Sequence, residues 1–269
     1  MMMKFATLID KEQISLWQKN LQDEDLDEVT KVLEESKVLE VLDMSSNKLA
    51  FTNSKFIYAV AKNPTLTVLF LNGNTVGPKG ALALSSILKC TQTIRKLSLS
   101  NNEILAEGAR HLASALLTNK SLTFMDLRNN NIGDEGALYL AASLKNNTSI
   151  RDIRLEGNNI SDKGAEKLVD VLESNNVLEG FMLDDNPISD LLKKRMGGIQ
   201  SKREVESLKT IIAEKDAVIA ARDEEMANMK AEMARILGQI DSLKLNVESL
   251  VSGTSRPSNS KVQFAGVDI

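Results

Sequence analysis

An eleven-residue motif recurs six times in this chain and limits what the chain can fold into. Each copy follows the pattern L-x-x-L-x-L-x-x-N-x-I/L, with another apolar residue at some of the leucine positions. Four of the five intervals between successive copies are identical, and the first interval is one residue shorter. Such a fixed period predicts stacked repeats, in which each repeat is one supersecondary unit packed on its neighbours. The copies begin at Leu39, Leu66, Ile94, Leu122, Ile150 and Leu178.

The motif itself predicts a short strand followed by a tight turn. Apolar residues alternate within each copy, as at Leu97 and Leu99, and this period of two places one face of a strand in the core. An asparagine follows each strand, and its side chain can bond the backbone groups that a buried turn would otherwise leave unpaired. These asparagines form a column: Asn47, Asn74, Asn102, Asn130, Asn158 and Asn186.

A helix is expected after each turn. Gly-Ala pairs begin at Gly80, Gly108, Gly136 and Gly164, again with the period of the motif, and small residues let a helix start close to the neighbouring repeat. Leucines then recur at i and i+4 on one helix face. One strand and one helix in each repeat predict a curved α/β horseshoe, with parallel strands on the concave side and helices on the convex side.

This pattern resembles the ribonuclease-inhibitor-like class of leucine-rich repeats. The class includes ribonuclease inhibitor, the sensor arrays of NOD-like receptors, the actin-capping domain of tropomodulin and the activator of the Ran GTPase. The resemblance covers roughly Leu39 to Met196. It implies the horseshoe fold and the binding of other proteins, which is almost all that the members have in common.

The two ends of the repeat array are expected to be capped. Residues 1–38 are predicted to form an N-terminal helical cap, with an amphipathic helix that includes Val29 and Leu33. Trp17, together with Ile14 and Leu16, is expected to seal the first repeat. The solenoid is expected over residues 39–196, and Gly197-Gly198 is expected to form a break or a hinge after it.

A second module is predicted over residues 199–251, where the apolar period changes to a heptad. Fourteen positions keep the alternating spacing of 3 and 4, and only Lys215 and Arg222 among them are polar. Such a pattern is typical of a coiled coil. The apolar positions are Val205, Leu208, Ile212, Ile219, Met226, Met229, Met233, Ile236, Ile240, Leu243, Val247 and Leu250.

Charges beside this seam favour a parallel dimer. In that arrangement each g residue faces the next e residue of the partner, so Glu204 faces Lys209 and Glu225 faces Lys230. A helix that pairs with a different protein, or folds back on the solenoid, would show a similar stripe. The chain is therefore expected to be a homodimer or one strand of a heteromeric coiled coil.

Composition limits which classes of partner are expected and in which cellular compartment the protein is expected. The formal charge of −4 argues against a nucleic-acid partner. One cysteine, Cys90, fits a reducing compartment, and no secretory signal is recognised. No run of about 18 apolar residues is present, so no membrane span is expected. The cytoplasm is the expected location, and residues 252–269 are expected to be a disordered tail.

The sequence contains no recognisable catalytic or metal-binding motif. His111 is the single histidine and Cys90 the single cysteine, which excludes a His/Cys zinc site and leaves a Cys–His catalytic pair without support. We therefore expect no enzyme activity, no cofactor and no metal.

The concave side offers a candidate protein-binding surface. Residues between the core positions of each strand should face this side. Most of them are small or polar, but Phe70, Phe124 and Met182 are large and apolar, and Arg128 and Arg154 lie among them. Aromatic residues and arginine often anchor protein interfaces. A binding role for this face is therefore expected, although repeat proteins also bind through their edges and convex helices.

These features together favour a non-enzymatic scaffold or adaptor. The solenoid would bind a protein partner, and the coiled coil would dimerise the chain or dock it into an assembly. This layout resembles that of cytoskeletal, ciliary and centrosomal leucine-rich-repeat proteins, which implies a cytoskeletal or ciliary location. The alternatives are a regulator of a small GTPase and an actin-binding cap of the same repeat class.

Overall fold

The computed structural model describes residues 8–252 of the 269-residue chain. The chain divides into two compact units, Met1–Glu204 and Val205–Ile269. The tail expected at 252–269 lies outside the described residues except for Ser252.

The first unit is built on one parallel sheet. Within the described residues, seven strands pair in chain order from β1 to β7. Equivalent residues of successive strands lie one repeat apart, so Leu97 pairs with Met125 and Met125 with Ile153. The strands are Gln13–Ser15 (β1), Val41–Asp43 (β2), Val68–Phe70 (β3), Lys96–Ser98 (β4), Phe124–Asp126 (β5), Asp152–Arg154 (β6) and Gly180–Met182 (β7).

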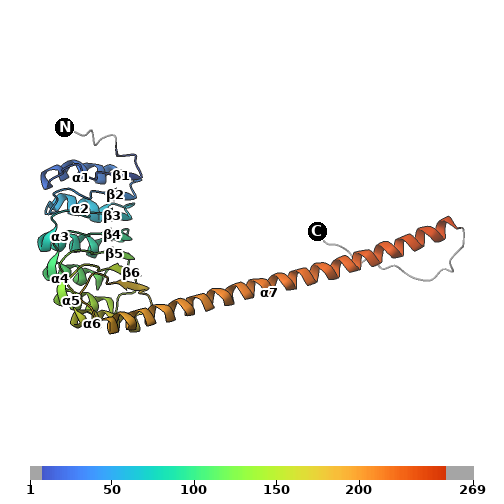
Figure 1. Cartoon of the computed structure of the whole chain (residues 1–269). Coiled ribbons are helices and arrows are strands. Elements are labelled where there is room, and N and C mark those ends of the chain that lie inside the picture. The colour runs from blue at the N-terminus through green and yellow to red at the C-terminus, as the bar shows by residue number, and fades with distance from the viewer. Residues whose placement is uncertain (1–7, 253–269) are drawn as a thin grey trace. The chain divides into compact units, whose positions relative to one another are not determined.

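Helices cover one side of this sheet (Figure 1). Each helix follows one strand and packs against the helix of the next repeat, from α1 through to α6. The horseshoe architecture predicted from the repeat is confirmed. A short 3-10 helix, η2 (Asp23–Asp25), comes first, and the helices are α1 (Leu26–Glu35), α2 (Ser54–Lys62), α3 (Gly77–Cys90), α4 (Leu105–Leu116), α5 (Gly133–Leu144) and α6 (Asp162–Ser174).

The core lies between strands and helices and runs through all repeats. Leu97, Leu99 and Leu127 are buried there, as the alternating pattern predicts. The glycines of the Gly-Ala pairs allow the close packing that was expected of them. A Cβ added at Gly80 would lie 2.3 Å from the carbonyl oxygen of Ala50, a contact that no side chain can make.

The asparagine column provides hydrogen-bond partners for the backbone groups of the turns after the strands. The side chain of Asn130 donates to the carbonyl oxygens of Leu99 at 2.8 Å and Leu127 at 2.9 Å. Its oxygen accepts hydrogen bonds from the backbone N–H groups of Asn102 at 3.0 Å and Ile104 at 3.3 Å. One buried side chain therefore links two repeats, and the column repeats this bond along the solenoid.

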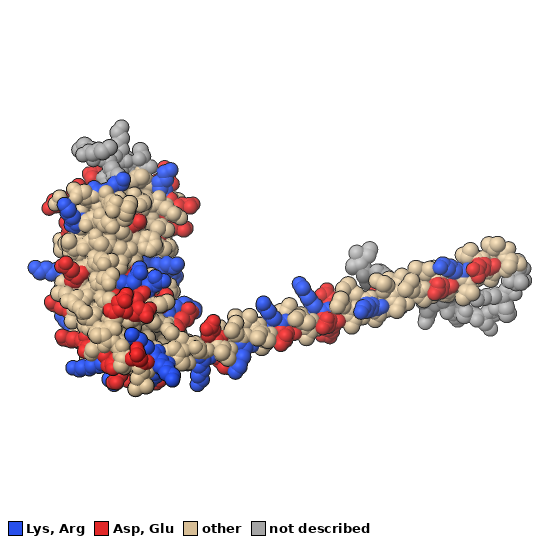
Figure 2. Space-filling model, viewed as in Figure 1, with Lys and Arg blue, Asp and Glu red and all other residues tan. Residues whose placement is uncertain are grey.

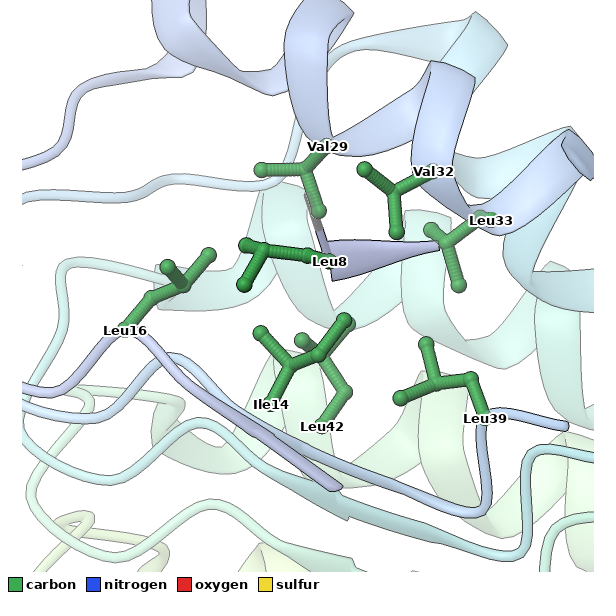
Figure 3. A pocket seen from close by; sticks show the side chains of 8 residues that line it. All are labelled: Leu8, Ile14, Leu16, Val29, Val32, Leu33, Leu39 and Leu42. Carbon is green, nitrogen blue, oxygen red and sulfur yellow. The ribbon is translucent and has the colours of Figure 1, made fainter. Parts of the chain in front are cut away.

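The N-terminal cap contains a strand as well as the predicted helix. Strand β1 pairs with β2, and Ile14 and Leu16 point toward Val29, Val32 and Leu33 of α1 (Figure 3). Their packing leaves no space for a water molecule.

The expectation for Trp17 is wrong. Its side chain is 51% exposed, because the alternation along β1 places Ile14 and Leu16 inward and Ser15 and Trp17 on the opposite face.

The last helix, α7, spans Asp190–Val251 without interruption. It passes through Gly197-Gly198, so the break expected there is absent. Leu192 and Met196 are buried against the repeats. Arg203 reaches the carbonyl oxygens of Leu172, Asn175 and Leu178. The first unit accordingly ends at Glu204, beyond the solenoid end expected at 196.

In the second unit, α7 is a single helix from Val205 to Val251. Lys and Arg side chains alternate along it with Asp and Glu side chains, and uncharged surface lies between them (Figure 2). The twelve apolar heptad residues are all between 42% and 81% exposed. This part of the helix therefore presents an apolar stripe, interrupted by Lys215 and Arg222, that is not covered in the described chain.

Candidate protein-binding surface

The strand register arranges the concave side chains in three rows. We call the surface formed by these rows the concave face. The first row runs through Gln13, Val41, Val68, Lys96, Phe124, Asp152 and Gly180. The second runs through Ser15, Asp43, Phe70, Ser98, Asp126, Arg154 and Met182. The third row lies two residues beyond the second row in the sequence. It comprises Trp17, Ser45, Asn72, Ser100, Arg128, Glu156 and Asp184.

Phe124 and Arg154 are in contact on this face. The guanidinium carbon of Arg154 lies 5.5 Å from the centre of the Phe124 ring, within the range of a cation–π interaction. The two residues come from neighbouring strands, β5 and β6. This contact holds both side chains in place, so the predicted aromatic and cationic anchors form one preformed unit.

Arg128 is paired with a buried carboxylate. Its Nε and Nη2 atoms donate to the two oxygens of Asp126 at 3.0 Å and 2.7 Å. Burial alone would raise the pKa of Asp126, but the hydrogen bonds from Arg128 and from the Ser98 hydroxyl outweigh it and lower the pKa. The carboxylate therefore stays charged and fixes the position of Arg128, whose side chain remains 40% exposed.

Two polar atoms on β6 and just beyond it are buried without a hydrogen-bond partner in the described protein. They are Nε of Arg154 and Oε2 of Glu156. Loss of water around the carboxyls raises the pKa of Glu156 and also that of Asp152. Both atoms are covered by the protein itself, so neither is open to a bound molecule in this conformation.

The structure brings together four of the five predicted binding residues. Arg154 pairs in register with Met182 on β7, and Phe124 and Arg128 belong to the adjoining strand and its turn. Phe70 lies on β3, separated from them by β4. It is half-buried in the second row.

Sequence reasoning missed Trp17 as a member of this face. Ile14 and Leu16 precede Leu42 and Met44 of the first motif by one repeat length, and this spacing could have revealed a seventh, incomplete copy. In that copy Trp17 falls in the third row, next to Ser45. Backbone pairing agrees, because the N–H of Gln18 donates to the carbonyl oxygen of Ser45 at 3.1 Å.

Other kinds of site find no support in the part of the chain that the structure describes. Residues 8–252 contain no group of three or more His, Cys, Asp or Glu side chains that could hold a metal ion. None of the helices in this range has the length and apolar character needed to cross a bilayer. Cys90 is exposed and unpaired in the same range.

Comparison with known families agrees with the geometry. The sequence model of the family described as "Leucine Rich repeat" matches residues 62–85, 91–113, 118–141 and 146–169. The matched segments are leucine-rich repeats. With one strand and one helix in each repeat, the chain follows the ribonuclease-inhibitor-like pattern. No curated protein matches this leucine-rich-repeat chain over its sequence.

Solved structures similar to this leucine-rich-repeat chain include two domains with low sequence identity. One is described as leiomodin-1 actin-binding site 2; it is 16% identical, with a TM-score of 0.49, and the match covers 60% of this chain and 95% of that domain. The other is the C-terminal domain of tropomodulin from Caenorhabditis elegans; it is 20% identical, with a TM-score of 0.49, and the match covers 58% of this chain and 95% of that domain.

Proposed function

We propose that the chain is a non-enzymatic scaffold whose concave face holds one protein partner. The helix beyond Glu204 dimerises this scaffold or docks it into a larger assembly. Leucine-rich repeats are protein-interaction modules, which supports the general part of this proposal. The features of the concave face support the choice of surface.

The contact between Phe124 and Arg154 carries the proposal. It places an aromatic ring and a guanidinium side by side on the concave face. Met182, which pairs in register with Arg154 and is 46% exposed, adds apolar area next to them. Interface anchors often combine a rigid aromatic ring, a guanidinium and surrounding apolar contacts.

This arrangement specifies what the partner must offer. It must supply an acceptor for the guanidinium of Arg128, whose side chain is 40% exposed, and a carboxylate or a carbonyl oxygen can be that acceptor. It must also bring apolar area that covers Met182 and the exposed edge of the Phe124 ring.

Capture of partners from the native cell tests this proposal. The variants are Phe70→Ala/Phe124→Ala, Met182→Ala and Arg154→Ala, each first shown to melt like the wild type. Loss of one anchor should cost about 2 kcal/mol, which weakens the complex roughly thirtyfold. Leu82→Ala on α3 is the matched control, because Leu82 is 49% exposed, almost the same as Met182, but lies on the convex side. Retention of every partner by all three concave variants would contradict the proposal.

The cytoplasm, and within it a cytoskeletal or ciliary assembly, is the proposed location. This part of the proposal rests on the similarity of a repeat array followed by a long helix to the cytoskeletal and ciliary proteins named above. Capture of actin or of a small GTPase by the concave face, lost in the same variants, would instead favour the two alternatives considered from the sequence.

A further inference from the structure

Charges on the part of α7 beyond Glu204 identify the molecule that covers its apolar stripe. We infer that the segment Val205–Val251 pairs with the same segment of a second copy of this chain, as a parallel coiled coil in unshifted heptad register. This inference deepens the helical part of the proposed function and does not depend on the concave face.

The apolar stripe is long enough for a stable pairing. Heptad positions run from Val205 to Leu250, and the helix is continuous throughout. Single exposed apolar residues are ordinary on protein surfaces, but a seam that repeats over seven heptads is not. The seam therefore calls for a partner helix of similar length.

Four charges in the second and third heptads of the stripe have no ion-pair partner within the described helix. Lys215 and Arg222 occupy d positions, and Asp216 and Asp223 follow them at e. Adjacent residues on a helix do not face each other, and none of these four forms an ion pair in the described chain, although Glu206 with Lys209 and Glu232 with Arg235 do. A lone helix leaves two cations inside its apolar seam.

A parallel second copy satisfies these charges. In a parallel two-stranded coiled coil each d residue packs beside the e residue of the facing helix. Lys215 then meets Asp216 of the second chain, and Arg222 meets Asp223 of the second chain. Each of the two layers holds two cations and two carboxylates, so its net charge is zero.

The neighbouring layers support the same orientation. Ile211 and Val218 are at g, where a parallel partner places them beside the a residues Ile212 and Ile219 of the second chain. Both are exposed in the described helix. The acidic e positions thus accompany the basic d positions, and the apolar g positions accompany the apolar a positions.

Other pairings of the same helices place the cations less well. A full antiparallel overlap sets Lys215 against Ile240 and Arg222 against Met233, which spreads the four cations over four layers. A parallel pairing shifted by one heptad spreads them over three layers. Polar core residues select register in this way because each misplaced one leaves an unpaired charge in an apolar layer.

The first test is the oligomeric state of the purified full-length chain. Analytical ultracentrifugation at about 50 μM should show twice the 29.5 kDa mass of one chain. Leu243→Glu should produce monomers, whereas Leu245→Glu should leave the dimer intact. These two leucines are equally exposed at 62%, but Leu243 is at d and Leu245 at f, on the opposite side of the helix. A monomeric wild-type chain, or dissociation by Leu245→Glu alone, would overturn the inference.

The second test addresses orientation and pairing of charges. The chains K215E/R222E and D216K/D223K should each self-associate at least about tenfold more weakly than the wild type. Mixed together, they should form a heterodimer, because every d residue again faces an opposite charge. Failure of the mixture to recover a dimer would rule out these contacts. Because only the purified chain is used, failure here leaves partner binding by the concave face untouched.

Crosslinking distinguishes the two directions. In a Cys90→Ser background, Leu250→Cys should form a disulfide-linked dimer under mild oxidation. A crosslink formed only when Leu250→Cys chains are mixed with Val205→Cys chains would show an antiparallel pair and contradict the inference.

Discussion

Arg203 takes the place that Asn175 occupies one repeat earlier. The side chain of Asn175 donates to the carbonyl oxygens of Leu144 at 2.7 Å and Asn147 at 2.9 Å. Arg203, one repeat further on, donates to the equivalent carbonyl oxygens of Leu172 and Asn175, the latter at 2.7 Å. The start of α7 thus completes the last repeat with the bonds that a following repeat would have made.

Removal of the hydrogen bonds donated by Arg203 should destabilise the C-terminal end of the solenoid. A chain that ends after Glu204 should melt within a few degrees of the full-length protein. One that ends after Gly198 should melt clearly lower, because Arg203 is lost and three carbonyl oxygens at the end of the solenoid lose their donor. Calorimetry of both shortened chains checks this, together with Arg203→Ala in the full chain, for which we expect a cost of about 1–3 kcal/mol. Equal melting of the two shortened chains would refute the capping role.

Asn130→Ala should destabilise the solenoid by about 1–3 kcal/mol. The substitution removes the donor for the carbonyl oxygens of Leu99 and Leu127 and the acceptor for two backbone N–H groups. Asn146→Ala, at an exposed position after α5, is the control and should change the free energy of unfolding by less than about 0.5 kcal/mol. Urea denaturation of both variants measures the difference.

Asp126→Asn should cost about 1–3 kcal/mol at pH 7, since it removes the charge that holds the Arg128 guanidinium. The folded pKa of Asp126 is lowered, so its stabilisation is fully present above the ordinary aspartate pKa of about 3.9 and is lost as the pH falls through the lower folded value. The difference between wild type and variant should therefore shrink in acid. Asp43→Asn, at the same position of β2, keeps an acceptor for the backbone N–H of Ser45 and breaks no arginine contact, so it should cost less.

Glu156→Gln should stabilise the free protein at neutral pH, by up to about 1 kcal/mol. Burial raises the folded pKa of Glu156, so its ionisation opposes folding as the pH rises through that value. The gain should vanish below the ordinary glutamate pKa of about 4.3, where both residues are neutral. Thermal melts from pH 4 to pH 8 check this, with Glu166→Gln on the exposed face of α6 as control. A destabilised variant at pH 7 would mean that Glu156 is satisfied in the fold.

The repeat was readable from the sequence because each of its elements recurs at the same interval. Apolar alternation located β2 to β7, and the asparagines after the strands located their turns. Strand β1 was missed because its copy of the motif has lysine, Lys19, where the others have asparagine. Without that strand, the alternation that separates Trp17 from Ile14 and Leu16 was not recognised, and Trp17 was expected in the core with them.

A second column of asparagines was also readable and was overlooked. Asn119, Asn147 and Asn175 stand one repeat apart and bond the ends of the preceding helices, as Asn63 does nearer the N-terminus. Extending that column by one more repeat reaches Arg203. The change of residue type conceals the match, because a guanidinium can replace the donor of asparagine but not its acceptor.

Alternation along the strands also predicted which side chains reach the concave face. It did not predict which of them touch. The contact of Arg154 with Phe124 depends on the register between β5 and β6, and that of Arg128 with Asp126 depends on side-chain conformation within one strand. These side-chain contacts decide which groups remain available to a partner. They can be identified only from the three-dimensional structure.

Site-specific photo-crosslinking in the native cell tests the central claim most directly. A photoreactive amino acid would replace Met182 on the concave face in one chain and Leu82 on the convex helix α3 in another. The two positions are 46% and 49% exposed, so accessibility does not distinguish them. We expect a discrete crosslinked partner from Met182, abolished by Arg154→Ala, and none from Leu82. A partner captured from Leu82 and not from Met182 would contradict binding at the concave face.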